Sequence, residues 1–133
     1  MSALLDTSVL VRYLSGDPPQ MLPVAIEIVE GQRDLWVSSV ALAETAHVLM
    51  SFYRIGRSMA IESLAALVQR ANIKPLNMDK ALLIQALLKA LPSGRVSVPD
   101  ALIWAEARSA AIPVVYSMDR RFPREGVEVK ASP

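Results

Sequence analysis

The sequence predicts an α/β fold in which helices flank a central, mainly parallel sheet. Two observations predict it. Short apolar segments, typical of buried strands, alternate along the chain with longer helical patterns. Acidic residues follow these segments or begin the next helices, which is where an open parallel sheet binds its ligands. The length of 133 residues fits one compact domain covering residues 1–133.

The chain begins with a strand, two helices and a second strand. Ala3–Leu5 and Leu35–Val37 are short apolar runs that predict buried strands. Apolar residues at helical spacing predict helices over Val9–Leu14 and Val24–Glu30. A turn at Gly16–Pro19 separates these two helices.

The middle of the chain is expected to form an αα-hairpin. Val40–Tyr53 is a long helical pattern that ends near Gly56. Ser58 is expected to cap a second helix, which runs to about Ala71. The surplus apolar side chains of this hairpin form an expected dimer face, for example Leu64, Leu67 and Val68.

The last third continues the alternation. Ile73–Leu76 is short and contains a proline, so an edge strand and a connection are both open for it. Asp79–Leu91 is a strongly amphipathic helix that Pro92-Ser93-Gly94 ends, and Val98–Ala111 is a further helix. The final strands are expected at Pro113–Tyr116 and Val127–Val129.

Composition excludes several classes of protein. The hydrophobic fraction of 53% and mean hydropathy of +0.34 indicate a large core and an oligomer interface, but no apolar run reaches the ~18 residues of a membrane helix. The absence of cysteine excludes disulfides and thiolate zinc sites. The N-terminus lacks the basic region of a signal peptide, so a cytoplasmic location is expected.

The net charge of +1 gives no global field that would attract nucleic acid. Any basic surface must therefore be local. The candidates are Arg54 with Arg57, and Arg120, Arg121 and Arg124.

Four acidic residues are candidate ligands of one metal site. Asp6 and Asp119 follow expected strands, and Glu44 and Asp100 lie in the first turns of helices expected to start at the same sheet edge. Ligands that are all oxygen select hard cations such as Mg²⁺ or Mn²⁺. Such an ion suits phosphodiester hydrolysis, because it activates water, orients the phosphate and neutralises the leaving oxygen. The single histidine, His47, excludes a two-histidine ribonuclease and argues against a zinc hydrolase.

Each carboxylate also has a local structural explanation. Asp100 with Ser97 fits a capping box loosely, and Asp6 is a candidate helix cap. Glu44 and Asp119 fit a solvated helix position and a turn. The shared sheet edge favours a common site over four separate explanations.

Four segments around these residues resemble, in order and spacing, the motifs of the PIN domain family. They are Leu4–Leu10, Ser38–Glu44, Pro99–Ile103 and Ser117–Phe122. The resemblance spans nearly the whole chain and implies a three-layer PIN-like domain. This short form is most similar to the VapC-type toxins of bacterial and archaeal toxin–antitoxin pairs.

The resemblance implies an endoribonuclease that depends on Mg²⁺ or Mn²⁺. Asp6, Glu44, Asp100 and Asp119 would bind the metal, and one of them would also orient the attacking water. It further implies a homodimer and a cognate antitoxin protein that wraps the toxin and blocks its site.

Hydroxyls and arginines near the motifs are candidate supporting groups. Thr7, Ser8 and Ser117 would hydrogen-bond the carboxylates or the scissile phosphate, and Thr7 or Ser8 is also a candidate cap of the first helix. Arg120 and Arg121 are candidate contacts to RNA phosphates or partners of nearby acids. For two aromatic residues the structural role is favoured over the functional one: Trp104 as core and Phe122 as loop anchor.

Two other functions remain open. One is a non-catalytic PIN-like module that binds RNA or protein, although four filled acidic positions argue against a decayed site. The other is a PIN nuclease of RNA processing outside toxin–antitoxin systems. A phosphatase of the aspartyl-phosphate type is disfavoured, because it needs a second acid two residues after Asp6, where Ser8 stands.

Overall fold

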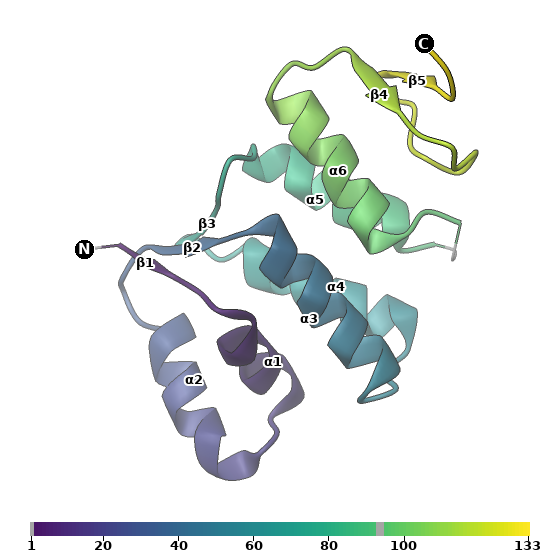
Figure 1. The fold of residues 1–133 in the computed structure, drawn as a ribbon. Helices are drawn as coiled ribbons and strands as arrows, with labels where there is room; N and C mark the ends of the chain where they lie inside the picture. The colour runs from purple at the N-terminus through teal and green to yellow at the C-terminus, as the bar shows by residue number, and fades with distance from the viewer. Residues whose placement is uncertain (1, 93–94) are drawn as a thin grey trace.

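A computed structural model describes residues 2–92 and 95–133 (Figure 1). Its strands are β1 (Ala3–Leu4), β2 (Leu35–Val37), β3 (Ile73–Pro75), β4 (Val114–Tyr116) and β5 (Glu128–Lys130). Its helices are α1 (Thr7–Ser15), α2 (Leu22–Val29), α3 (Ser39–Ser51), α4 (Arg57–Val68), α5 (Lys80–Ala90) and α6 (Val98–Ser109), with a 3₁₀ turn at Pro19–Met21. Part of the expected helix stop, Ser93 and Gly94, lies outside the described residues.

All strand pairs are parallel, as the sequence predicts, and the α/β class is confirmed. β1, β2 and β3 form one sheet in that order, and β4 pairs with β5 in a second. β3 is therefore an edge strand rather than a connection. Figure 1 shows the two sheets well apart, with α5 and α6 between them.

The outer edge of β1 has no partner strand in the described part of the chain. The N–H groups of Ala3 and Leu5 donate to the carbonyls of Asp34 and Trp36 at 3.0 and 2.8 Å. Because alternate residues of a parallel strand direct their N–H and C=O groups to opposite sides, those of Leu4 face the open edge. Its side chain is 63% exposed, which is unusual in a parallel sheet.

The outer edge of β4 is open in the same way within residues 2–92 and 95–133. Ser117 donates to Lys130 O at 2.9 Å and Pro113 O accepts from Glu128 N at 2.8 Å, so these residues face β5. The alternate residue Tyr116 faces the open edge and is 64% exposed. The structure thus contains two unpaired parallel edges with exposed apolar side chains.

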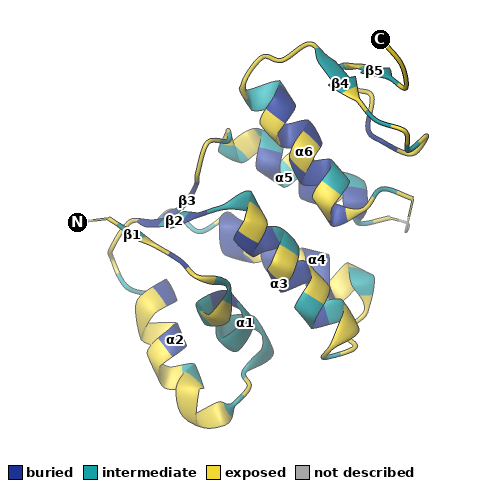
Figure 2. Ribbon diagram, in the orientation of Figure 1, coloured by how far each residue is buried: buried dark blue, intermediate teal, exposed yellow. Residues whose placement is uncertain are grey.

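The core lies mainly among helices α3 to α6, whose inward faces are buried in Figure 2 while much of α2 is exposed. The expected dimer face is wrong, because α4 packs between α3 and α5 within the same chain. Leu64, Leu67 and Val68 are at most 2% exposed and belong to the core. These three side chains are therefore used within the chain.

Several helix starts differ from the prediction, and at α1 and α4 the reason is that another residue is the cap. α1 begins at Thr7 because Asp6, with extended backbone, is its cap and accepts a hydrogen bond from the Ser8 N–H. α4 begins at Arg57 after Gly56, so Ser58 lies inside the helix and does not cap it. α1 ends at Gly16, whose φ of +72° is the left-handed conformation that glycine adopts without strain.

None of the helices within residues 2–92 and 95–133 has the length and apolar character needed to cross a membrane.

Candidate active site

Asp6 stands directly after the β1–Leu5 segment and faces solvent. Its Oδ2 accepts hydrogen bonds from the Ser8 hydroxyl at 2.6 Å and from the Ser8 N–H at 3.1 Å. These bonds hold the pKa of the Asp6 carboxyl below its usual value, the hydroxyl bond contributing most. Asp6 is therefore an oriented, ionised carboxylate at neutral pH.

Asp119 lies in the turn after β4. Its Oδ1 accepts from the Arg121 N–H at 2.8 Å and from Arg121 Nε at 3.2 Å. These contacts lower the pKa of Asp119, first through the backbone bond and then through the guanidinium. The Ser117 hydroxyl accepts from the Asp119 N–H at 3.1 Å, which fixes the turn rather than the carboxylate.

Glu44 is exposed on the second turn of α3, a helix capped by Ser38, whose hydroxyl accepts from the Ala41 N–H at 3.2 Å. Among the described residues Glu44 has no ion pair. His47, one turn later, is also exposed, and its Nε2 lies 3.3 Å from the Ser51 hydroxyl. Glu44 thus has no structural role that its contacts reveal.

Asp100 lies in the first turn of α6, and its side chain is partly exposed. Its N–H donates to the hydroxyl of Ser97, the helix cap, at 3.1 Å. The cap bond is made by the backbone of Asp100, so it does not use the carboxylate. The position suits an acid in any case, because the helix dipole favours negative charge there.

The structure does not gather the four acids into one cluster. In residues 2–92 and 95–133, no three histidine, aspartate or glutamate side chains are placed to hold a metal ion. Asp6 follows a strand of the three-stranded sheet, and Asp119 follows a strand of the separate pair. The expected common edge would require β1 and β4 to lie in one sheet.

Arginines gather beside Asp119. A hollow of about 370 Å³ is lined by residues 95–96 and 120–125, with guanidinium groups from Arg95, Arg120, Arg121 and Arg124. We call it the arginine hollow. The sequence singled out the last three as basic candidates, but not Arg95. No local signal marks Arg95, because it reaches the others only through the packing of the chain.

Trp104 and Phe122 are structural, as predicted. Trp104 is fully buried, and its Nε1 donates to Glu125 O at 2.8 Å. Phe122 is 4% exposed and anchors the segment after Asp119 in the core. Arg57, one of the basic candidates, is also structural, because it donates to Ala90 O at 3.0 Å and Val96 O at 2.7 Å.

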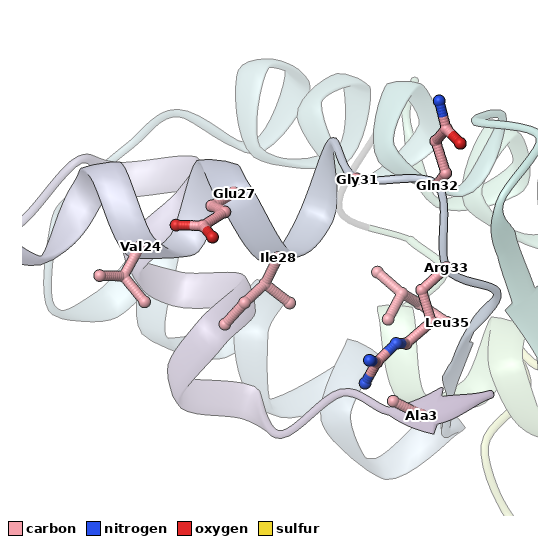
Figure 3. Close-up of a pocket in the computed structure, with 8 residues that line it drawn as sticks. All are labelled: Ala3, Val24, Glu27, Ile28, Gly31, Gln32, Arg33 and Leu35. Carbon is pink, nitrogen blue, oxygen red and sulfur yellow. The ribbon is translucent and has the colours of Figure 1, made fainter. Parts of the chain in front are cut away.

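A second hollow, of about 350 Å³, lies between α2 and the beginnings of β1 and β2 (Figure 3). Val24, Ile28 and Leu35 give it apolar walls, while Gln32 points away from it. Ala3 and Leu35, which line it, are the first residues of their strands. Because ligands of open parallel sheets bind outside the carboxyl ends of the strands, we do not place the active site here.

Comparison with known families finds one family whose model matches most of the chain. The model of the PIN domain family matches residues 3–127, a span that includes all four acids. PIN domains are generally nucleases, and this match therefore gives the chain a nuclease-type fold. No curated protein matches the chain.

Proposed function

We propose, from the premise that this chain belongs to the PIN domain family, that it is an endoribonuclease dependent on Mg²⁺ or Mn²⁺. One observation carries the proposal. Asp6, Glu44, Asp100 and Asp119 stand in the order of the family's acidic motifs, each following a strand or lying in the first two turns of a helix, with none of them buried. Structural contacts do not account for Glu44, and Asp6 and Asp119 are held in the ionised form.

The donor chemistry fits a hard divalent cation, since all four candidate ligands are carboxylates. Their placement does not yet fit, because no three of them are gathered in the described residues. When bound, such an ion lowers the pKa of water and neutralises charge on the leaving oxygen of a phosphodiester. The chain's own contribution is orientation: Ser8 fixes Asp6 and Arg121 fixes Asp119.

We propose that a site including both Asp6 and Asp119 forms when the open edge of β1 pairs with the open edge of β4. Each edge offers unpaired backbone groups and an exposed apolar side chain, Leu4 or Tyr116, and such edges favour pairing. The β4 edge would come from the same chain or from a second copy. In the second case the expected homodimer and the complete site would arise together.

Introduced cysteines test this pairing, because the chain has none of its own. In the variant carrying Leu4→Cys and Ser117→Cys, paired strands about 4.8 Å apart would bring the thiols within disulfide range. Residue 117 is chosen because, in a parallel ladder, a residue that faces the partner strand lies opposite one that faces away from it, and Ser117 N donates to Lys130 O of β5. A cross-linked monomer would show pairing within one chain, and a cross-linked dimer would show pairing between copies. The control pair Leu4→Cys with Met59→Cys, whose second cysteine takes an exposed position of α4, should give neither product. Equal oxidation rates of the two pairs would contradict a shared site.

One observation favours a second candidate, a non-catalytic RNA-binding module. A single chain does not gather three ligands in its described part, and such a module would need none. A cleavage assay with total cellular RNA distinguishes the two functions. Cleavage that requires Mg²⁺ or Mn²⁺ and the Asp6 carboxylate supports the nuclease, whereas binding without cleavage supports the module.

We further propose that the nuclease is the toxin of a VapBC-type pair, with RNA as substrate and a cognate antitoxin as partner. The support is the resemblance of the four motifs and the compact length. Expression of the chain alone in a bacterial host should arrest growth, and Asp6→Asn should remove the arrest. Normal growth with active, soluble nuclease would favour an RNA-processing enzyme instead.

A further inference from the structure

The arginine hollow has two walls that come from distant parts of the chain. Arg95 and Val96 precede α6, and residues 120–125 follow β4. Arg95, Arg120, Arg121 and Arg124 are all exposed, so their guanidinium groups are accessible from solvent. One of them, Arg121, contacts an acidic motif residue, Asp119.

The hollow has a net positive charge even when its ion-paired side chains are not counted. Arg121 is paired with Asp119 at 3.2 Å. Glu125, the one acid in the lining, is paired with Lys89 at 3.0 Å, which lowers the pKa of its carboxyl. Arg120 and Arg124 form no ion pair within residues 2–92 and 95–133, so they supply positive charge to the hollow.

The backbone of the hollow is fixed without help from Arg120 or Arg124. Glu125 O accepts from Trp104 Nε1 at 2.8 Å and from Arg108 Nη1 at 3.1 Å. Arg57 holds the other wall through Val96 O. A rigid backbone that presents exposed arginines loses less conformational entropy on binding than a mobile one.

The residues that line the hollow flank two of the acidic motifs in the chain. Arg120 and Arg121 directly follow Asp119, and Val96 directly precedes Ser97, the cap of the helix that carries Asp100. A ligand held in the hollow is therefore adjacent to Asp119, whose carboxylate lies 3.2 Å from Arg121 Nε. The positive end of the α6 dipole adds to the attraction for anions.

We propose that the arginine hollow binds phosphate groups of the RNA strand next to the bond that is cleaved. This inference rests on the proposed function and names the surface that would hold its substrate. Guanidinium groups form planar pairs of hydrogen bonds that match phosphate oxygens, and several arginines around one hollow suit the repeated charges of a strand. Arg95 and Arg124 are thereby added to Arg120 and Arg121 as RNA contacts.

Binding is measured by fluorescence anisotropy with a labelled single-stranded oligoribonucleotide in EDTA, with Asp6→Asn present in every protein so that no cleavage occurs. The test variant carries Arg120→Gln and Arg124→Gln. The matched control carries Arg33→Gln and Arg54→Gln, two exposed arginines outside the hollow with the same total change of charge. Melting temperatures of both variants check that each protein is folded.

The test variant should bind at least about tenfold more weakly than the control. The slope of log affinity against log salt should fall in magnitude by about 1.4, since each contact to a single-stranded phosphate contributes ~0.7. Equal affinities and slopes for the two variants would overturn the inference. A hollow-dependent affinity for polyglutamate with unchanged RNA binding would also overturn it, and would identify an acidic protein segment as the occupant. Because no metal or cleavage is involved, the result is independent of whether the nuclease proposal stands.

Discussion

Replacing Glu44 by glutamine tests whether its carboxylate serves cleavage or the stability of the fold. Glu44 is exposed, lies in the second turn of α3 and has no ion pair in the described part of the chain. Glutamate and glutamine have similar helix propensities, and the dipole effect fades beyond the first turn. The free energy of unfolding should therefore change by no more than about 0.5 kcal/mol, or about 2 °C in Tm.

RNA cleavage should respond very differently to the same change. Loss of a residue that only supports a metal ligand typically costs 10- to 100-fold, so loss of a ligand should lower the cleavage rate by at least about 100-fold. That factor corresponds to about 2.7 kcal/mol of activation free energy. The assay compares cleavage at saturating Mg²⁺ with thermal unfolding in EDTA, for Glu44→Gln and for Glu62→Gln as control. Glu62 is likewise exposed within a helix, α4, and its variant should keep full activity. A Glu44→Gln protein that cleaves RNA at the parental rate would refute the assignment of Glu44 as a ligand.

Two further predictions concern the contacts that position the site. Ser8→Ala removes the hydroxyl bond that contributes most to the lowered pKa of Asp6, so this pKa should rise toward 3.8 in an NMR titration, and an unchanged value would contradict the geometry. The stability that this bond contributes is fully present above the unfolded pKa of 3.8 and is lost as pH falls through the lower folded pKa, so parent and variant should converge in strong acid. Trp104→Phe removes a buried hydrogen bond and some core volume, while Glu125 O keeps its bond from Arg108. Unfolding free energy should fall by ~2 kcal/mol, seen as about 8 °C in Tm, and a shift under 2 °C would show that the indole contact contributes little.

The sequence predicted local elements well, because their signals lie within a few residues. Leu35–Val37 is the observed β2 without change, and Ile73–Pro75 falls within the segment for which a strand was one alternative. The observed helix starts differ from the predicted ones where several adjacent residues could be the cap, as near Asp6 and Gly56. Capping depends on which of several adjacent side chains reaches the free N–H groups, and the residue types do not decide this.

The pairing of strands was less predictable than their existence. The short apolar run at Pro113–Tyr116 predicts a strand, but it does not predict which strand lies beside it. The prediction that Asp6 and Asp119 share one edge assumed a single sheet, whereas the structure pairs β4 with β5 alone within its described residues. Sheet order depends on long-range packing, here the contact of α6 with α5 and the bond from Trp104 to Glu125.

The same limitation applies to the candidate RNA surface. Arg120, Arg121 and Arg124 are neighbours in the sequence and could be singled out from it. Arg95 is 25 residues before Arg120. The two line one hollow because the segment before α6 and the segment after β4 pack against the same core. The net charge gave no indication of a basic surface, since the chain as a whole is almost neutral at +1.

The most direct test of the central claim is cleavage of total cellular RNA by the purified parent and by Asp6→Asn prepared identically, in Mg²⁺, Mn²⁺ or EDTA. The account predicts discrete cleavage products from the parent alone, and only when a divalent ion is present. Cleavage of equal extent by both proteins, or full parental activity in EDTA, would contradict a metal-dependent nuclease built on these carboxylates.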